Sequence, residues 1–352
     1  MRAHKIWRPL AVAIAVTAAV GWPVWAALSA PSQPGTYPYR SDAFTTFLRD
    51  SDREVPARAQ PFYEWFEQAY ARSPVRLAGQ DTLLDALASR AQAVRVAGDA
   101  RRRTEEELNT AIWSYRLIKA TIPRFSLVRG YEFVWTVQFG ERQCLLQSVL
   151  MAGLLQAAGA DAGVAMVWKN MVGQESNNGH AVTIVRLSDG RDVEVDASEP
   201  RPVATHQGIF AADARRGGYR FLEPVFDRNG FITAYRPAAA QSAWLRPHDV
   251  NLLGISFLRS QFYYYRGEQV TGGLVNGPAT PQGLRTAARE LEQAVRFDAQ
   301  NPLAVYMLGR VYLRNGQAGR AKTMLRQAYA LYKDDGHLPA GLRAALAAVG
   351  MP

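Results

Sequence analysis

Cysteine is the scarcest reactive residue in this chain: Cys144 is the only one among 352 residues. A single cysteine excludes a disulfide framework within the chain. The five histidines offer no ligand pair at helix or hairpin spacing, so we expect no metal site. We expect no other cofactor, because the stretch GLVNGPAT (residues 273–280) lacks the lysine and the strand-loop-helix context of a phosphate loop.

Long hydrophobic runs are also missing. The apolar run at residues 10–20 is about 11 residues long, whereas a membrane-spanning helix needs roughly 20. It follows a basic start and precedes small residues, which is the pattern of a secretory signal. Residues 1–27 are therefore predicted to be a signal peptide cleaved near Ala26 or Ala27, or an N-terminal anchor if the run extends to Leu28. We expect a periplasmic or secreted protein, or one held in the inner membrane by this segment.

Acidic residues are fewer than basic ones, 31 against 41, which gives a net charge of +10. A basic surface suits anionic envelope polymers or lipid headgroups. Export gives no reason for binding nucleic acid, so we expect no nucleic-acid partner.

The middle of the chain combines helices with strands. Residues 28–103 are predicted to be a linker and helical region, and Thr104 with Glu107 has the pattern of a capping box at a helix start. From Val164 onward come five short strand patterns separated by turn residues: VAMVW, AVTIVRL, RDVEVD, YRFLEPVF and FITAY. Residues 104–246 are thus predicted to be an α+β unit in which N-terminal helices pack on an antiparallel sheet.

The last third, residues 247–352, is predicted to be all-helical. It resembles about two tetratricopeptide (TPR) repeats, the first of which begins near VNLLGISF (residues 250–257). The pattern is met by Leu308, Gly309, Tyr312, Ala321, Leu325 and Ala328, and by Ala287, Leu291 and Ala294 in the preceding repeat. We expect this region to bind a protein partner and to take no part in the chemistry.

Cys144 is predicted to begin an amphipathic helix. Leu145, Val149, Ala152 and Leu155 recur at helical spacing after it, and Gly159 supplies a stop. The first turn of a helix carries a partial positive charge, which stabilises a thiolate. Without a base nearby, a lone cysteine is more often a small buried apolar residue.

A base and an acid follow on a predicted hairpin. A three-residue loop at residues 188–190 would place His180 and Asp196 on one face as diagonal neighbours, whereas a two-residue loop would separate them. The first register also gathers apolar residues on the opposite face, so we favour it. Asp196 could then orient His180 toward Cys144. The other bases considered are His206 and His248, and the other acids are Asp192 and Glu194.

In their order and spacing, Cys144, His180 and Asp196 resemble the transglutaminase-like superfamily, over about residues 104–198. The resemblance implies a papain-like Cys-His-Asp triad in a catalytic domain at residues 104–246. The chain departs from the family at Val182, where an aromatic residue is frequent, and at Arg142, where glycine is usual.

The group that would bind the oxyanion is left open between two residues. Gln138 lies six residues before the cysteine, as the side-chain donor does in papain-like enzymes, and Trp135 is the alternative by analogy with transglutaminases.

Two functions follow from the sequence. The first is an exported cysteine peptidase, amidase or acyltransferase that acts on a protein or peptide, cell-wall peptide included. The second is a non-catalytic envelope scaffold that binds a protein partner through the TPR-like helices.

Overall fold

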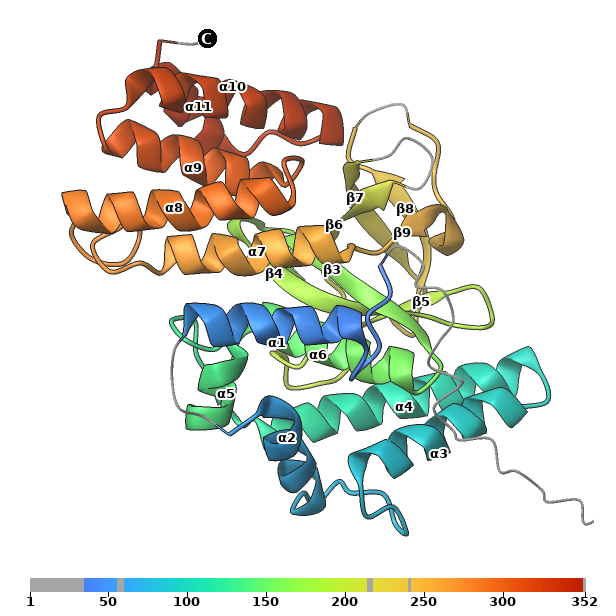
Figure 1. The fold of residues 1–352 in the computed structure, drawn as a ribbon. Coiled ribbons are helices and arrows are strands. Elements are labelled where there is room, and N and C mark those ends of the chain that lie inside the picture. The colour runs from blue at the N-terminus through green and yellow to red at the C-terminus, as the bar shows by residue number, and fades with distance from the viewer. Residues whose placement is uncertain (1–34, 56–59, 214–217, 240–241, 351–352) are drawn as a thin grey trace, which may run out of the picture. The chain divides into compact units, whose positions relative to one another are not determined.

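The computed structural model describes residues 35–55, 60–213, 218–239 and 242–350 (Figure 1). These residues belong to one compact unit, Ser32–Pro352. The predicted signal peptide or anchor at residues 1–27 lies outside the described residues. No helix among the described residues is both long and apolar enough to span a bilayer.

The first part of the described chain is helical. Ser41, Thr82 and Asp99 each accept a backbone N–H from the first turn of the helix that they precede. The elements here are α1 (Asp42–Glu54), α2 (Phe62–Ala71), α3 (Leu83–Val96), α4 (Ala100–Thr121), α5 (Phe133–Phe139) and the parallel strand pair β1 (Arg124–Phe125) and β2 (Glu141–Arg142).

The helix start predicted at Thr104 is wrong, because α4 begins at Ala100 after the Asp99 cap. Thr104 and Glu107 lie within α4 and bind a distant turn instead. The backbone N–H of Ser188 donates to Oε2 of Glu107 over 2.8 Å, and that of Asp189 donates to Oγ1 of Thr104 over 3.1 Å. A capping-box pattern therefore marks a tertiary contact here.

Helix α6 (Cys144–Ala157) lies at the centre of the unit, between α4 and strands β3 and β4 (Figure 1). Every residue from Cys144 to Leu155 is buried. The prediction that this helix is amphipathic is therefore wrong, because it has no solvent-exposed face along these residues and the surrounding elements cover it on all sides.

The strands form an antiparallel barrel. Their order is β3-β4-β5-β8-β7-β6, and β6 also pairs with β3, which closes the ring, while the short β9 adds to β6. The strands are β3 (Asp161–Lys169), β4 (Glu175–Arg186), β5 (Asp192–Val195), β6 (Gly208–Asp213), β7 (Tyr219–Phe226), β8 (Ile232–Pro237) and β9 (Val250–Asn251), which follows the short 3-10 helix η2 (Pro247–Asp249).

The predicted mixture of helices and antiparallel strands is confirmed, but closure of the sheet was not predicted. Strand β6, with the sequence GIFAAD, makes the closing contacts: Phe210 pairs with Phe221 on β7 and with Met166 on β3. Nearly all its residues are buried, so it lacks the alternation of polar and apolar residues that marks a half-exposed strand.

The C-terminal region is helical, as predicted. Helices pack in succession, α7 on α8, α8 on α9 and α9 on α10, and the residues of the TPR-like pattern are buried between them. A Cβ at Gly309 would lie 2.9 Å from Leu325, so glycine permits the close approach of α9 and α10. The helices are α7 (Ile255–Glu268), α8 (Pro281–Phe297), α9 (Pro302–Arg314), α10 (Ala318–Asp335) and α11 (Ala340–Ala348).

Candidate active site

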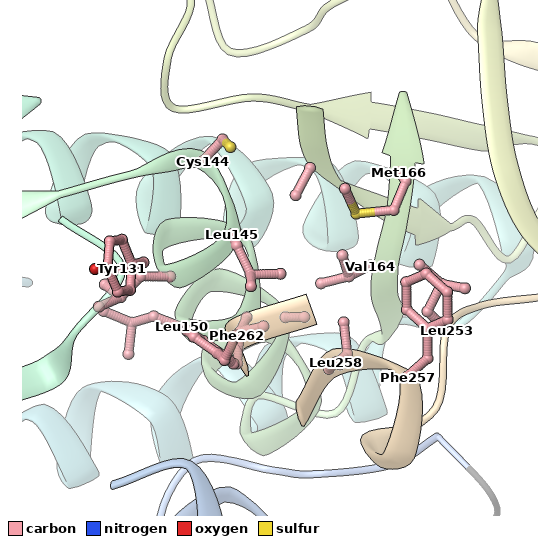
Figure 2. Close-up of a cluster of buried hydrophobic side chains, with 14 of the residues drawn as sticks. Tyr131, Cys144, Leu145, Leu150, Val164, Met166, Leu253, Phe257, Leu258 and Phe262 are labelled. Carbon is pink, nitrogen blue, oxygen red and sulfur yellow. The ribbon is translucent and has the colours of Figure 1, made fainter. Parts of the chain in front are cut away.

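Cys144 is the first residue of α6, as predicted, and it follows the N-cap residue Gln143. Cys144 is 4% exposed, and its side chain lies at one edge of the hydrophobic cluster drawn in Figure 2, above Leu145. Its place at the helix start exposes the sulfur to the partial positive charge of the first turn.

His180 and Asp196 are brought together by the predicted hairpin register. Thr183 pairs with Val195 and Arg186 with Asp192, which leaves a three-residue turn closed by Gly190 at φ 90°. Nε2 of His180 lies 2.6 Å from Oδ2 of Asp196. The opposite face of the hairpin is buried, as expected, and comprises Ala181, Thr183, Val185, Leu187, Val193, Val195 and Ala197.

Two hydrogen bonds hold α6 against β4, one turn beyond Cys144. Oγ of Ser148 donates to the carbonyl oxygen of Ala181 over 2.9 Å, and Oγ1 of Thr183 donates to that of Ser148 over 3.2 Å. Since Ala181 follows His180, these bonds fix the imidazole relative to the thiol. Nδ1 is the ring nitrogen left for Cys144, because Nε2 is engaged by Asp196.

The thiol and imidazole shift each other's ionisation in opposite directions. Burial raises the pKa of Cys144, but the hydrogen bond with His180 and the charge on its ring lower it by more, and the net pKa lies below its ordinary value. Burial lowers the pKa of His180, but hydrogen bonds with Asp196 and Cys144 hold the net pKa well above its ordinary value. The arrangement favours a thiolate beside an imidazolium.

The acid is held by groups that the sequence did not reveal. Asp196 is fully buried, and its Oδ1 accepts from the backbone N–H of Ser198 over 2.7 Å and from Nε2 of Gln147 over 3.2 Å. Arg142 donates through Nε to Oε1 of Gln147 over 2.8 Å. Because arginine can only donate, it fixes the orientation of the Gln147 amide. Burial raises the pKa of Asp196, but the hydrogen bond with His180, the charge on that ring and the backbone N–H of Ser198 together lower it by more, so the net pKa lies below its ordinary value.

Arg142, at the position where the superfamily that the chain resembles usually has glycine, makes further contacts. Its buried guanidinium also donates to the carbonyl oxygens of Ile122 and, over 3.2 Å, Ala197. Arg142 therefore ties the strand before α6 to the end of the hairpin that carries the acid. The sequence signal for this contact was Gln147, a polar residue one turn after the cysteine in a mostly apolar helix.

Tyr265, on α7, also reaches the thiol: its hydroxyl lies 3.7 Å from Sγ of Cys144. Burial raises the pKa of Tyr265 well above its ordinary value, so the hydroxyl keeps its proton and can donate to a thiolate. The expectation that residues 247–352 lie apart from the chemistry is wrong in this respect. No local pattern marks Tyr265, because its contact spans 121 positions of the chain.

Helix α7 is fixed to the N-terminal region by two ion pairs, of which the one made by Arg266 is buried and the one made by Arg259 is partly buried. Nε and Nη2 of Arg266 donate to Glu132 over 2.6 Å and 3.0 Å, and Arg259 makes a similar pair of bonds with Asp50 of α1. Bidentate pairs of this kind restrict geometry strongly. They hold Tyr265 at the thiol.

Among the described residues, neither Gln138 nor Trp135, the candidates for binding the oxyanion, forms a hydrogen bond with the thiol, whose hydroxyl neighbour is Tyr265. Gln138 is exposed on α5. Trp135 is half-buried, and its ring meets that of Tyr131 at 5.7 Å, edge to face, while Tyr131 stacks on Tyr265. Both roles stay predictions.

A second histidine lies beside the first. His206 is buried, its Nδ1 is bonded to Oε1 of Glu194, and its ring centroid is 5.3 Å from that of His180. His248, by contrast, is exposed on η2, where its Nε2 lies 3.8 Å from Oδ1 of Asp249. From the sequence, His206 was an alternative to His180 as the base, and Glu194 an alternative to Asp196 as the acid. That His206 and Glu194 bind each other was not predicted.

The expectation of no metal site stays a prediction, although three possible ligands do lie close together. Ligand atoms of His180, Asp196 and His206 lie within 4.8 Å of one another, a group that could hold a metal ion. His206 comes from the segment between β5 and β6, so hairpin or helix spacing could not reveal the group.

Comparison with known proteins found no match: no family model, no curated protein and no solved structure is significantly similar to this chain. The candidate site therefore rests on its own geometry.

Proposed function

We propose that this protein is a cysteine enzyme that cleaves or exchanges amide bonds by acyl transfer. The observation that carries the proposal is the arrangement of Cys144, His180 and Asp196, in which the buried Asp196 is bonded to His180. The pKa of the Cys144 thiol is lowered and the pKa of the His180 imidazole is raised. This is the arrangement that the resemblance to the transglutaminase-like superfamily implies.

In the first half-reaction, the Cys144 thiolate attacks the carbonyl carbon of the substrate amide, and the carbonyl π electrons move to oxygen. The tetrahedral species then collapses as the C–N bond breaks. The leaving amine takes its proton from the His180 imidazolium, and a thioester with Cys144 remains. Asp196 stabilises the imidazolium and holds its ring, without itself exchanging the proton.

In the second half-reaction, neutral His180 removes a proton from water or from a second amine as that molecule attacks the thioester. The C–S bond breaks, the thiolate leaves and the imidazolium is restored. Water gives hydrolysis and an amine gives transfer, and both use the same residues. We propose a peptide or protein substrate in the cell envelope, in keeping with the predicted export signal.

A burst experiment tests this proposal. The full chain is mixed with an activated ester, such as p-nitrophenyl acetate, and release of nitrophenol is followed together with the intact mass of the protein. We expect a burst of one equivalent and an acetyl adduct at Cys144. Cys144→Ala should show neither. Equal release from both proteins, with no adduct, would contradict the proposal.

One observation favours the competing function, a non-catalytic scaffold that binds a protein partner through the C-terminal helices. Cys144 is 4% exposed, as an inert buried cysteine would be. The side chain of His180, however, is 24% exposed, so solvent reaches the imidazole. A scaffold predicts no adduct at Cys144 in the burst experiment.

A further inference from the structure

Beside the candidate triad lies a small cavity whose walls come from the barrel and the C-terminal helices. Its volume is about 50 Å³. Gly179, the residue before His180, lines it, together with aromatic residues from both sides: Trp168, Phe210, Phe221, Phe257 and Tyr332. Phe221 packs against Trp168 at 5.4 Å, edge to face, and stacks on Tyr332 at 5.9 Å. Interlocked rings of this kind make a rigid apolar wall.

Two of the lining side chains, Trp168 and His337, carry polar groups that offer no charge to the cavity. Nε1 of Trp168 donates to the carbonyl oxygens of Ile209 and Leu222 over 3.1 Å and 3.3 Å. His337 closes one side, and burial lowers the pKa of this histidine, which keeps it neutral. The walls therefore present no charge to an occupant.

One lining group is different: Nε2 of Gln261 has no hydrogen-bond partner among the described residues, although Gln261 is fully buried. The orientation of this amide is fixed by its neighbours. Oδ1 of Asn301 accepts from the backbone N–H groups of Leu303 and Ala304, so Nδ2 of Asn301 is the group that donates to Oε1 of Gln261, over 3.2 Å. Nε2 of Gln261 must then be the free donor.

The cavity lies next to the reacting atoms. Phe257, Gln261 and Tyr265 are four residues apart on α7 and share one face of the helix. The first two line the cavity and the third contacts the thiol, about 6 Å further along the helix axis. A group bound in the cavity would therefore belong to the molecule being attacked.

We propose that this cavity binds a small aliphatic side chain of a peptide substrate, and that the backbone carbonyl oxygen of the same residue accepts the free N–H of Gln261. This inference rests on the proposed function. The size indicates the class of side chain, because an apolar cavity that binds benzene has a volume of about 150 Å³, and this one is about a third of that. A buried amide donor without a partner is unfavourable, so a substrate carbonyl completes the site.

Binding of capped tripeptides, acetyl-Gly-X-Gly-amide, tests the proposal without requiring turnover. Calorimetry is done on full-length Cys144→Ala, with glycine, valine or phenylalanine at X. We expect the valine peptide to bind roughly 10- to 200-fold more tightly than the glycine peptide, and the phenylalanine peptide to bind no better than glycine. Equal binding of all three, or preference for phenylalanine, would overturn it.

Two variants on the Cys144→Ala background separate the parts of the site. Leu303→Phe fills the cavity from α9 and should bring the affinity for the valine peptide down to that for glycine. Gln261→Met removes the donor and should weaken both peptides about tenfold. Gln282→Met, an exposed glutamine on α8, is the matched control and should change neither. If Gln261→Met binds as the control does, the assigned role of the amide is wrong.

The result is separable from that of the burst experiment. Peptide selectivity without an adduct at Cys144 would support the cavity and overturn the acyl-transfer proposal. An adduct without peptide selectivity would do the reverse.

Discussion

Two histidine–carboxylate pairs lie side by side in this molecule, and they differ in what surrounds them. His180 is bonded to Asp196 and faces the thiol of Cys144, and its side chain is 24% exposed. His206 is bonded to Glu194, and its side chain is 6% exposed. The first pair has a nucleophile and access to solvent. The second lacks that access.

The second pair has a structural function instead. The backbone N–H of His206 donates to Oε2 of Glu194 over 3.3 Å, and the backbone N–H of Ala204 donates to the carbonyl oxygen of Glu194 over 3.1 Å. These bonds fold the segment after β5 back onto the strand. A histidine with a carboxylate partner thus becomes a candidate base only where a nucleophile and access coincide.

The largest expected difference between the pairs comes from removing each histidine. His180→Ala should lower kcat/KM by roughly 100-fold to 10,000-fold, since the thiol loses its base and the leaving group its acid. His206→Ala should lower kcat/KM by less than about tenfold, but should destabilise the fold by ~1–3 kcal/mol because Glu194 loses its partner while buried. Steady-state kinetics and thermal unfolding measure both. The reverse order of activities would show that His206 is the base.

The acids should differ in the same direction with a smaller effect. Asp196→Asn should lower kcat by about 100-fold, less than His180→Ala, because the base is misdirected but present. Glu194→Gln should have little effect on kcat. The double variant His180→Ala with Asp196→Asn should be scarcely worse than His180→Ala alone, since residues that act as a unit are not additive. Full additivity would mean that Asp196 acts independently of His180.

The pH dependence should sharpen the comparison further. The active form needs a thiolate and an imidazolium, so kcat/KM should rise as Cys144 ionises below its usual range and fall as His180 deprotonates above its own. Asp196→Asn should move the alkaline limb to lower pH, because the imidazolium loses its stabilising charge. Glu194→Gln should move neither limb. A profile that rises only above pH ~8.5, the ordinary value for cysteine, would contradict the ion pair.

The smallest expected effect is that of Tyr265→Phe. Loss of a hydroxyl 3.7 Å from Sγ should raise the pKa of Cys144 slightly, because sulfur is a weak acceptor. The acid limb of the profile should then shift upward by a few tenths of a unit. Tyr263→Phe is the matched control, since its hydroxyl donates to Glu54 on α1 and not to the thiol. An equal shift in both variants would assign the effect to packing of α7.

Local rules were sufficient for the parts of the site that are close in sequence. The extent of α6 followed from the spacing of its apolar residues and from Gly159 just beyond its end. The hairpin register followed from the alternation of side chains between the two faces of a strand. That register alone put His180 and Asp196 on one face.

Contacts between distant segments could not be predicted this way. Gln147 and Arg142 reach Asp196 and its neighbour across about 50 positions, and Tyr265 reaches Cys144 across 121. Closure of the barrel likewise depends on β6 pairing at both edges. These contacts and the closure of the barrel depend on how distant segments pack, which no local sequence pattern shows.

The role of α7 also changes what a truncation would do. A chain ending near Arg246 would lose Tyr265 from the site and leave the buried Glu132 without Arg266. Removing one partner of a buried ion pair is strongly destabilising, so this shortened chain should not fold as the full chain does.

The central claim is that His180 holds Cys144 as a thiolate, and the rate of alkylation by iodoacetamide measures this most directly. In the native full chain at pH 6, Cys144 should react fast, His206→Ala should react at a similar rate, and His180→Ala should react far more slowly. A thiol that reacts only after denaturation, or equally in His180→Ala and the unaltered chain, would contradict the account.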